Sequence, residues 1–384
     1  MKTEAEIINV IQLGEDSSRQ FKEKLNNATQ IAIEMCAMSN STGGIIFVGV
    51  KDDGTISGLE AKEIQTYNQW ISAAANEHIK PPVYPRTQTI EVDGEPVMLI
   101  HLSEGVSKPY CDKDGIYWIK SGSDKRKASP QELARMFQES GQIQIDETAT
   151  TANIDEIDLP KFYTFFEKNY SQQVGSDEIW LDQVLPNMNL ARGGKLTLAG
   201  LLLFGKNPQT VKPFCLIRAV AYPGSEISDD VFNDKRDCMG SLDEQFRSAM
   251  TFLKNNLSRV QTDTSFNSKP SLEIDERALE EAVVNALLHR DYSKNGVIRL
   301  LVFKDRVEIV SPGKLPNHLS VENIKSGNSV MRNPLMASFG TKILPYSGIG
   351  SGIPRIIRNH PATELINDQD GEQFTIILKR NKRP

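Results

Sequence analysis

Residues 275–290, with the sequence DERALEEAVVNALLHR, constrain the fold of this chain more than any other segment. Asp275 is a good N-cap for a helix, and apolar residues follow at helical spacing, at positions 279, 282, 283, 286 and 287. Glu281 and Asn285 fall about one turn apart on the other face. The pattern predicts an amphipathic helix. The apolar runs that follow it, VIRLLVFKD and RVEIVSPG, predict strands, so this part of the chain alternates helix and strand.

Two further motifs follow this helix in order. SPGKLP (residues 311–316) ends a strand, and PYSGIGSGIPRI places Gly348, Gly350 and Gly352 immediately before a second helix. Backbone amides in such a turn can face an anion, and the partial positive charge of the helix N-terminus favours one. Taken alone, the carboxylate/amide pair is typical of a solvated polar face, and the glycine turn is typical of a helix cap. Together and in this order, they indicate a site for a metal and a phosphate.

The three motifs resemble the nucleotide-binding fold shared by gyrase, Hsp90, histidine kinases and MutL. More specifically, NALLHRDY, SPGKLP and GIGSGI resemble the divergent ATP-binding module of bacterial proteins labelled RecG-related helicases or transcriptional regulators, over residues 270–384. The resemblance implies ATP and Mg²⁺ as ligands. It assigns Glu281 to orienting or deprotonating the attacking water and Asn285 to holding the Mg²⁺ that bridges the phosphates. It places the remaining nucleotide contacts at Ser311, Gly313, Gly348, Gly350 and Gly352.

The chain departs from this family pattern at one position. Ser311 stands where the family has the Asp that reads the adenine amino group, which puts adenine selectivity in question. The chain also contains no GxxxxGK[ST] loop, so we do not expect a motor helicase. Glu281 would permit slow ATP hydrolysis. An interaction protein with a vestigial ATP site is an alternative.

The amino-terminal motifs are EDSSRQFKEKL (15–25), AMSNSTGGIIFVGVKDDGTISGL (37–59), KPY (108–110) and WIKSGSDKRKAS (118–129). Together they resemble the Schlafen/AlbA-like nucleic-acid-binding domain. Some relatives are nucleases that use two glutamates, a lysine and an aspartate around a divalent metal. The matching positions are Glu15, Gln20, Lys22, and Asp52 or Asp53. Gln20 replaces a carboxylate, and a neutral amide is a poorer ligand for a hard cation. The resemblance therefore leaves Glu15 and Asp52 as candidate metal ligands, while the substitution argues against cleavage.

Basic residues of this segment predict a surface that follows the phosphates of a nucleic acid, with the salt dependence that such binding carries. The alternative is that the DKRK run is a solvated turn. Tyr117 and Trp118 alternate along a strand, so one of them is expected in the core. The candidate nucleic-acid contacts are Lys22, Lys24, Lys120, Lys125, Arg126 and Lys127.

The sequence predicts an α/β (α+β) chain with a Schlafen/AlbA-like domain at residues 1–140 and a polar linker at 141–156. A helix-rich connecting α/β region follows at 157–269, and an α/β sandwich with the ATP-binding motifs at 270–384. The formal net charge is −6, which argues against wholesale coating of nucleic acid but permits a local basic patch. Four cysteines lie far apart without a CxxC pair, so neither a zinc site nor a disulfide framework is predicted. The start of the chain is not a signal peptide and the longest apolar run, LAGLLLFG, is too short to cross a bilayer, which predicts a cytoplasmic protein without membrane contact.

These interpretations combine into an ATP-responsive nucleic-acid-binding protein that acts on DNA as a transcriptional regulator. The enzyme alternative is a metal-dependent RNA or DNA nuclease of Schlafen type, which could serve in defence against phage. The sequence leaves a homo-oligomer open.

Overall fold

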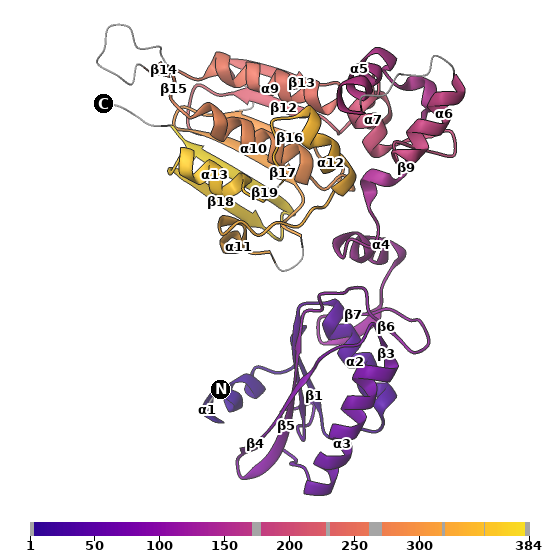
Figure 1. Ribbon diagram of the computed structural model, residues 1–384. Helices are drawn as coiled ribbons and strands as arrows, with labels where there is room; N and C mark the ends of the chain where they lie inside the picture. The colour runs from indigo at the N-terminus through magenta and orange to yellow at the C-terminus, as the bar shows by residue number, and fades with distance from the viewer. Residues whose placement is uncertain are drawn as a thin grey trace. The chain divides into compact units, whose positions relative to one another are not determined.

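The computed structural model describes residues 4–170, 178–227, 231–260, 271–316, 319–348 and 350–380. The chain divides into two compact units, Met1–Ile143 and Gln144–Pro384 (Figure 1). Both units combine helices with β-sheets, so the α/β fold predicted from the sequence is confirmed. The boundary that the sequence predicts at residues 269/270 lies outside the described residues.

The first unit is built on a four-stranded sheet with the order β1–β2–β5–β4. β1 runs parallel to β2, and β5 runs antiparallel to both of its neighbours. Two short pairs, β3 with β6 and β7 with β8, lie outside this sheet. The strands are β1 (Arg19–Lys22), β2 (Gly43–Val48), β3 (Ile79–Lys80), β4 (Arg86–Val92), β5 (Glu95–Ser103), β6 (Cys111–Asp112), β7 (Trp118–Ser121) and β8 (Asp124–Lys127).

Helices cover both faces of this sheet because the central strands are apolar on both sides. Along β2, Ile46 and Val48 belong to the core under α2 and α3, whereas Phe47 belongs to the core under α1 (Figure 1). A π-helical turn extends α3, and α4 begins at Ser129 with the predicted cap, completed by Glu132 as a capping box. The helices are α1 (Glu4–Gln12), α2 (Ala28–Asn40), α3 (Ala61–Ala73), the π-turn (Ala74–His78) and α4 (Pro130–Glu139).

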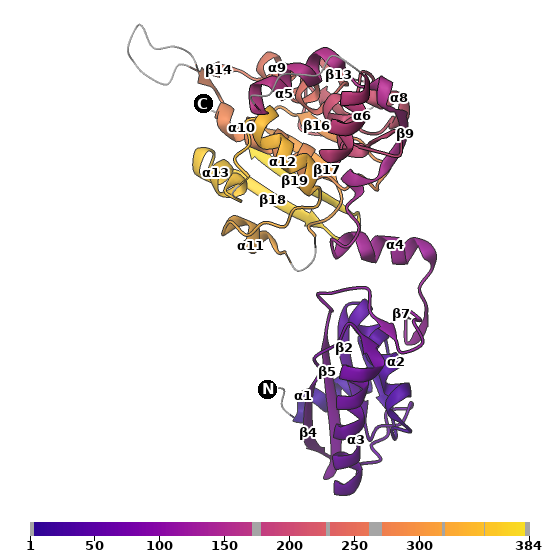
Figure 2. The same ribbon diagram turned by 45° about the vertical axis from the view of Figure 1, so that its right-hand side comes forward.

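The second unit contains a six-stranded sheet with the order β13–β12–β16–β17–β19–β18, in which β12 and β16 are parallel and the other neighbours antiparallel. α9, α10 and α13 lie on one face of it (Figures 1 and 2). The strands are β12 (Ile217–Ala221), β13 (Asp234–Cys238), β16 (Ile298–Val302), β17 (Arg306–Pro312), β18 (Thr363–Asp368) and β19 (Gln373–Lys379). The helices that accompany them are α9 (Leu242–Asn256), α10 (Glu276–His289), α11 (Val321–Lys325), α12 (Pro334–Ile343) and α13 (Gly352–Asn359).

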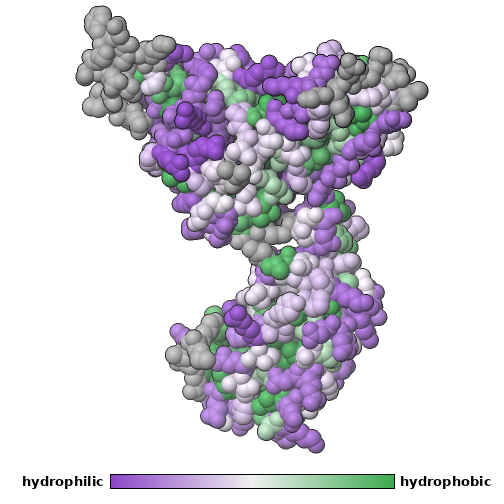
Figure 3. All heavy atoms as spheres, in the orientation of Figure 1, coloured by the Kyte–Doolittle hydropathy of each residue, from purple (hydrophilic) through white to green (hydrophobic). Residues whose placement is uncertain are grey.

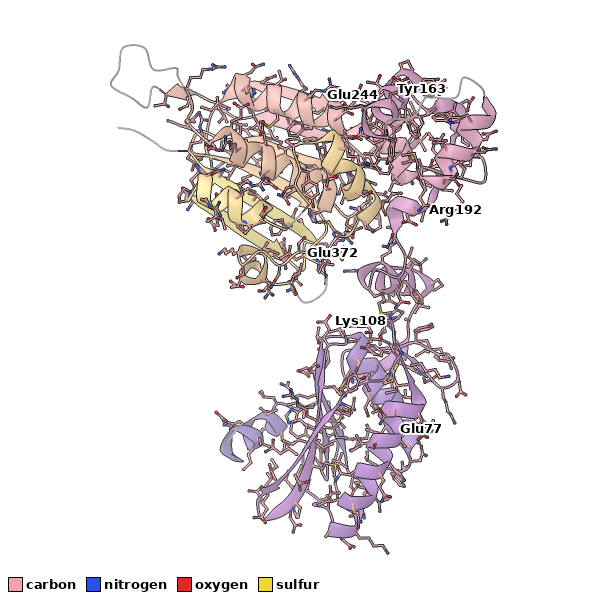
Figure 4. All side chains as sticks on the ribbon, viewed as in Figure 1. Glu77, Lys108, Tyr163, Arg192, Glu244 and Glu372 are labelled. Atoms are coloured by element: carbon pink, nitrogen blue, oxygen red, sulfur yellow. The ribbon has the colours of Figure 1, made fainter. Side chains whose placement is uncertain are left out.

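Smaller elements complete the second unit beside this sheet. A three-stranded sheet, β10–β11–β9, is accompanied by four helices, and a two-stranded ribbon joins β14 with β15. The helix α9 begins with a capping box in which Glu244, labelled in Figure 4, accepts from the backbone amide of Ser241 at 2.8 Å. The remaining elements are β9 (Ala149–Asn153), α5 (Leu159–Tyr170), α6 (Glu178–Asn187), β10 (Ala191–Arg192), β11 (Lys195–Thr197), α7 (Leu198–Phe204), α8 (Pro208–Val211), β14 (Arg259–Val260) and β15 (Ser271–Leu272).

The segment predicted as a linker, residues 141–156, folds as part of the second unit from residue 144 onward. It contains β9, which pairs with β11, and two single turns of 3₁₀ helix. Ala152 and Asp146 are fully buried, and Asp146 accepts a hydrogen bond of 2.9 Å from the backbone amide of Met336 at the start of α12. The polar composition of the segment resembles that of a loop, but its Thr residues fit a short strand whose partner lies more than forty residues later.

The region predicted to connect the domains, residues 157–269, supplies two strands of the large sheet. Ile217 of β12 pairs with Ile298 of β16, so the sheet extends across the predicted boundary at residue 270. In the described part of the chain, no helix combines the length and apolar character that crossing a membrane requires. Hydrophilic side chains cover most of the face shown in Figure 3, with hydrophobic ones scattered among them.

Candidate functional site

A pocket in the second unit opens between α10, the ends of β17 and β19, and the turn before α13. Five of the residues singled out in the sequence line it: Asn285, Ser311, Gly313, Gly350 and Gly352. Segments separated by more than sixty residues of sequence therefore meet at one place, as the motif order suggested. Apolar side chains form much of the remaining wall, among them Ile309, Leu315, Ile324, Val330, Phe374 and Ile376.

The helix α10 carries the predicted polar pair, of which Asn285 lines the pocket and Glu281 does not. It begins at Asp275, whose side chain accepts from the amides of Arg277 and Ala278, as the sequence predicted. Asn285 donates from Nδ2 to the Glu281 carbonyl at 2.7 Å, which leaves its amide oxygen as the atom available to a ligand. The Glu281 side chain is only 3% exposed, although the opposite face of the helix carries the apolar stripe.

Arg355 of α13 holds the Glu281 carboxylate. Its Nη1 lies 3.0 Å from Glu281 Oε2, while Glu281 Oε1 is buried and has no hydrogen-bond partner in the described part of the chain. Nη2 of Arg355 donates to the hydroxyls of Ser347 and Ser351 at 3.2 and 2.9 Å. Burial raises the pKa of Glu281, and the nearby Arg355 guanidinium offsets part of this rise. The result is a carboxyl group whose pKa lies above its ordinary value and whose Oε1 has no hydrogen-bond partner among the described residues.

The glycine turn allows α13 to approach α10 closely. A Cβ at Gly352 would lie 2.6 Å from Glu281 Oε1 and 2.8 Å from Asn285 Nδ2, so no other residue fits without displacement. Gly348 and Gly350 both have φ near +72°, where glycine is strongly favoured. Gly348 does not line the pocket, and Ile349 lies outside the described residues.

At the other end of the pocket, β17 positions Ser311 and Gly313. Ser311 has the same alternation as Val307 and Ile309, so it faces α10, where its hydroxyl lies 3.4 Å from the Ala286 carbonyl. Gly313 has a φ of +99°, and a Cβ there would lie 2.4 Å from the Asp291 side chain. Its amide donates to the carbonyl of Glu372, labelled in Figure 4, at 2.7 Å.

His289 also lines the pocket, one turn after Asn285. Burial lowers the pKa of His289 to about 4, and the positive charge of Arg332 contributes to the shift. The imidazole is therefore neutral at physiological pH, with one nitrogen that donates and one that accepts.

In the first unit, two of the predicted nuclease positions, Glu15 and Gln20, form a hydrogen-bond chain with Lys120. Gln20 donates from Nε2 to Glu15 Oε1, which also accepts from the Phe21 amide at 2.6 Å. The other side-chain atom of Gln20, Oε1, accepts from Lys120 Nζ at 2.6 Å. Burial lowers the pKa of Lys120. Gln20 thus bridges a carboxylate and a buried lysine, a role for which its combined donor and acceptor groups suit it.

A carboxylate that sequence reasoning missed, Glu34 of α2, lies beside this chain. The side chain is buried, and its Oε1 accepts from Lys125 Nζ and lies 3.8 Å from Lys22 Nζ. Its Oε2 has no hydrogen-bond partner within the ranges that the structure describes. The sequence did carry a signal for it, because Glu34 is the one charged residue within the apolar run IAIEMCAM. Arg355 had a similar signal, since an arginine in the first turn of a helix opposes the helix dipole and needs a nearby anion.

The other predicted basic residues also interact with neighbouring side chains. Lys24 pairs with Glu63 at 2.7 Å, and Lys127 lies 5.9 Å from the centre of the Trp118 ring. Arg126 forms two hydrogen bonds with Glu132, and they lower the pKa of Glu132 to about 2. All of these side chains except Lys120 retain solvent exposure, so a phosphate could replace their present partners at modest cost.

The candidate metal ligands Glu15 and Asp52 lie on different segments of the first unit, Glu15 before β1 and Asp52 after β2. Asp52 is exposed in the turn after β2. Within the described ranges, no three His, Cys, Asp or Glu side chains are arranged to hold a metal ion.

Comparison with protein families gives two matches. The family described as "Schlafen, AlbA_2" matches residues 15–129, and the family described as "Putative ATP-dependent DNA helicase recG C-terminal" matches residues 296–378. The resemblances seen in the sequence are therefore confirmed in both halves of the chain. None of the curated proteins matches this chain.

Two solved structures are similar to the chain. A crystal structure of the DIP2311 protein from Corynebacterium diphtheriae is 21% identical, with a TM-score of 0.50, and the match covers 95% of this chain and 76% of that one. A solution structure of the N-terminal domain of a "Putative ATP-dependent DNA Helicase RecG-related Protein" from Nitrosomonas europaea is 18% identical, with a TM-score of 0.24, over 34% of this chain and 95% of that one. At this identity, the first match supports the fold alone.

Proposed function

Because this chain carries a Schlafen, AlbA_2 domain followed by a RecG-related, ATPase-like C-terminal domain, we propose that it binds a nucleic acid and that ATP regulates this binding. The observation that carries the proposal is the meeting of Asn285 and Gly352 at one edge of a largely apolar pocket, with the buried Glu281 carboxylate beside Gly352. A polar edge suits phosphates, and an apolar wall suits a base.

The residues at this edge fit a cation-bound phosphate chain. Glu281 Oε1 is buried and has no hydrogen-bond partner among the described residues, and the glycine at position 352 lets the start of α13 lie close to this oxygen and to the Asn285 amide. Asn285 would hold Mg²⁺ through its amide oxygen, and the ion would supply charge neutralisation for the phosphates.

The side chains of this chain have separate roles in the proposal. The backbone amides at the start of α13 and its dipole stabilise phosphate oxygens. Glu281, with its raised pKa, can accept a proton from a water molecule, and Arg355 holds the carboxylate in position until then. Slow hydrolysis is compatible with this geometry, but regulation requires only that ATP bind two states of the protein with different affinity.

In the first unit, the nucleic acid would contact the basic hairpin β7–β8 and its neighbours. Lys22 and Lys125 share one carboxylate, Glu34, so their combined charge exceeds that of their partner. A phosphate that approaches them gains a net attraction without desolvating an isolated cation. We propose DNA as the nucleic acid and transcription as the regulated process, with assembly into a homo-oligomer as a further element of the same proposal.

Isothermal titration with ATP and Mg²⁺ tests the nucleotide site. The wild-type protein should bind with measurable heat, and Asn285→Ala should weaken binding at least about tenfold, because it removes a charge-assisted contact. Asn169→Ala is the matched control, since Asn169 makes the same side-chain bond to the carbonyl four residues earlier, at 2.8 Å, but lies on α5 away from the pocket. Absence of heat from the wild type would identify a vestigial site and refute the proposal.

A further inference from the structure

The described pocket wall where a base would bind contains no carboxylate that could select one base over another. Among the described residues that line the pocket, none is Asp or Glu, and Lys314 is the one that carries a charge. Carboxylates accept hydrogen bonds but cannot donate them, so a site that reads an amino group through a carboxylate rejects a carbonyl at the same position. The described wall therefore has no carboxylate with which to distinguish an amino group from a carbonyl group.

Strand register fixes which side chains a base would meet. Phosphates near Gly352 and Asn285 place the base toward β17 and β19, where Ile309 pairs with Ile376 and Ser311 pairs with Phe374. The first pair is fully buried and apolar, so it packs equally well against any purine ring. Ser311 is then a polar group of this wall that can meet the edge of the base.

The Ser311 hydroxyl can act toward a ligand either as a hydrogen-bond donor or as an acceptor. It is 7% exposed, and its only hydrogen bond in the described chain, to the Ala286 carbonyl, is long at 3.4 Å. A hydroxyl rotates to donate or to accept. It can therefore accept from the 6-amino group of adenine or donate to the 6-oxo group of guanine. His289 offers the same choice, because a neutral imidazole donates from one nitrogen and accepts at the other, and its two tautomers exchange these roles.

We propose that this pocket binds purine nucleoside triphosphates with little discrimination between adenine and guanine. The inference rests on the proposed nucleotide site and names its ligand class. A site that must hydrogen-bond one group rejects an analogue lacking that group by about 10⁴-fold or more. With a rotatable hydroxyl and a neutral imidazole instead, the dissociation constants of ATP and GTP should differ by less than about tenfold.

Competition titration measures this ratio directly. A fluorescent ATP analogue is bound to the full chain with Mg²⁺ and displaced by ATP, GTP, CTP or UTP. We expect ATP and GTP to compete within about tenfold of each other, and both pyrimidine nucleotides to compete more weakly because their smaller ring leaves part of the apolar wall uncovered. ATP that competes more than about a hundredfold better than GTP would overturn the inference while leaving the nucleotide site itself intact. Failure of every nucleotide to bind would instead refute the proposed function, and the inference with it.

Two variants of one residue test the assignment to Ser311. Ser311→Asp introduces an acceptor that cannot donate, so it should raise the preference for ATP over GTP at least about tenfold. Ser311→Ala introduces no charge and should weaken the binding of ATP and GTP by the same factor. It is the alternative test if the carboxylate of the Ser311→Asp protein prevents folding. A Ser311→Ala protein that loses affinity for one purine alone, or a folded Ser311→Asp protein with an unchanged ratio, would show that Ser311 does not meet the base.

Discussion

Removal of Arg355 should destabilise the second unit through Glu281 rather than through lost packing. The Glu281 carboxylate is 3% exposed, and Arg355 is the cation that holds it, at 3.0 Å. Removing one partner of a fully buried ion pair costs about 3–5 kcal/mol, whereas an exposed pair contributes about 0–1 kcal/mol. The Arg355 side chain is 35% exposed, so the loss should lie between these limits, at roughly 1–3 kcal/mol. For a unit of this size, the melting temperature should fall by about 2–12 °C.

The stability deficit of the Arg355→Ala protein should depend on pH. In the wild type, the folded-state pKa of Glu281 already lies above its ordinary value because of burial. Arg355→Ala removes the charge that offsets part of this rise, so the pKa should rise further. The folded state then binds more protons than the unfolded state between the two pKa values, and stability falls as the pH rises through this window. The deficit of Arg355→Ala should therefore shrink as the pH is lowered toward the ordinary pKa of a glutamate.

Thermal unfolding followed by circular dichroism at several pH values measures these effects. Arg358→Ala is the matched control, because Arg358 is an exposed arginine on the same helix, and it should change stability by less than about 0.5 kcal/mol. Glu281→Gln in the Arg355→Ala background should remove both the deficit and its pH dependence. If Arg355→Ala behaves like Arg358→Ala, or if its deficit persists unchanged after Glu281→Gln, the ion pair does not carry the stability assigned to it.

Two further predictions concern one residue of each unit. Gly352→Ala should weaken ATP binding in a titration, because the new Cβ would lie 2.6 Å from Glu281 Oε1 and 2.8 Å from Asn285 Nδ2 and would displace both side chains. Gly224→Ala has open space and should bind normally. A Gly352→Ala protein with wild-type affinity would contradict the close approach. Glu34→Gln should strengthen binding to a DNA oligonucleotide and steepen its dependence on salt, because it removes the carboxylate shared by two lysines, while Glu77→Gln at an exposed position of the same unit (Figure 4) should change neither. Fluorescence anisotropy over a salt series measures this, and an unchanged slope would show that these lysines do not contact phosphate.

The sequence predicted those features that depend on neighbours along the chain. The helix with its Asp275 cap and the start of α4 at Ser129 follow from local hydrogen bonds and spacing, and the structure places both there. The ion pair between Glu281 and Arg355 joins residues 74 positions apart, and that between Lys125 and Glu34 joins residues 91 positions apart. Only the fold brings such residues together, so a sequence reading could count these charges but could not pair them.

The same limit explains the difference in the segment at 141–156. Its composition is polar and acidic, which is typical of an exposed connection. The partner of β9 is β11, and the buried Asp146 contacts α12, 190 residues away. A short polar strand is recognisable mainly through its partner, which lies far away in the sequence.

The parallel pairing of β12 with β16 decides where this protein can be divided. A fragment that starts near residue 270 would keep the nucleotide motifs but lose β12 and α9. The backbone groups of Ile298–Val302 would then form an unprotected sheet edge, ready to pair with other molecules. The apolar surface of α10 that packs against α9 would meet water as well. Aggregation of such a truncated protein would result from the loss of these elements. A fragment that keeps the whole second unit has to begin near residue 144.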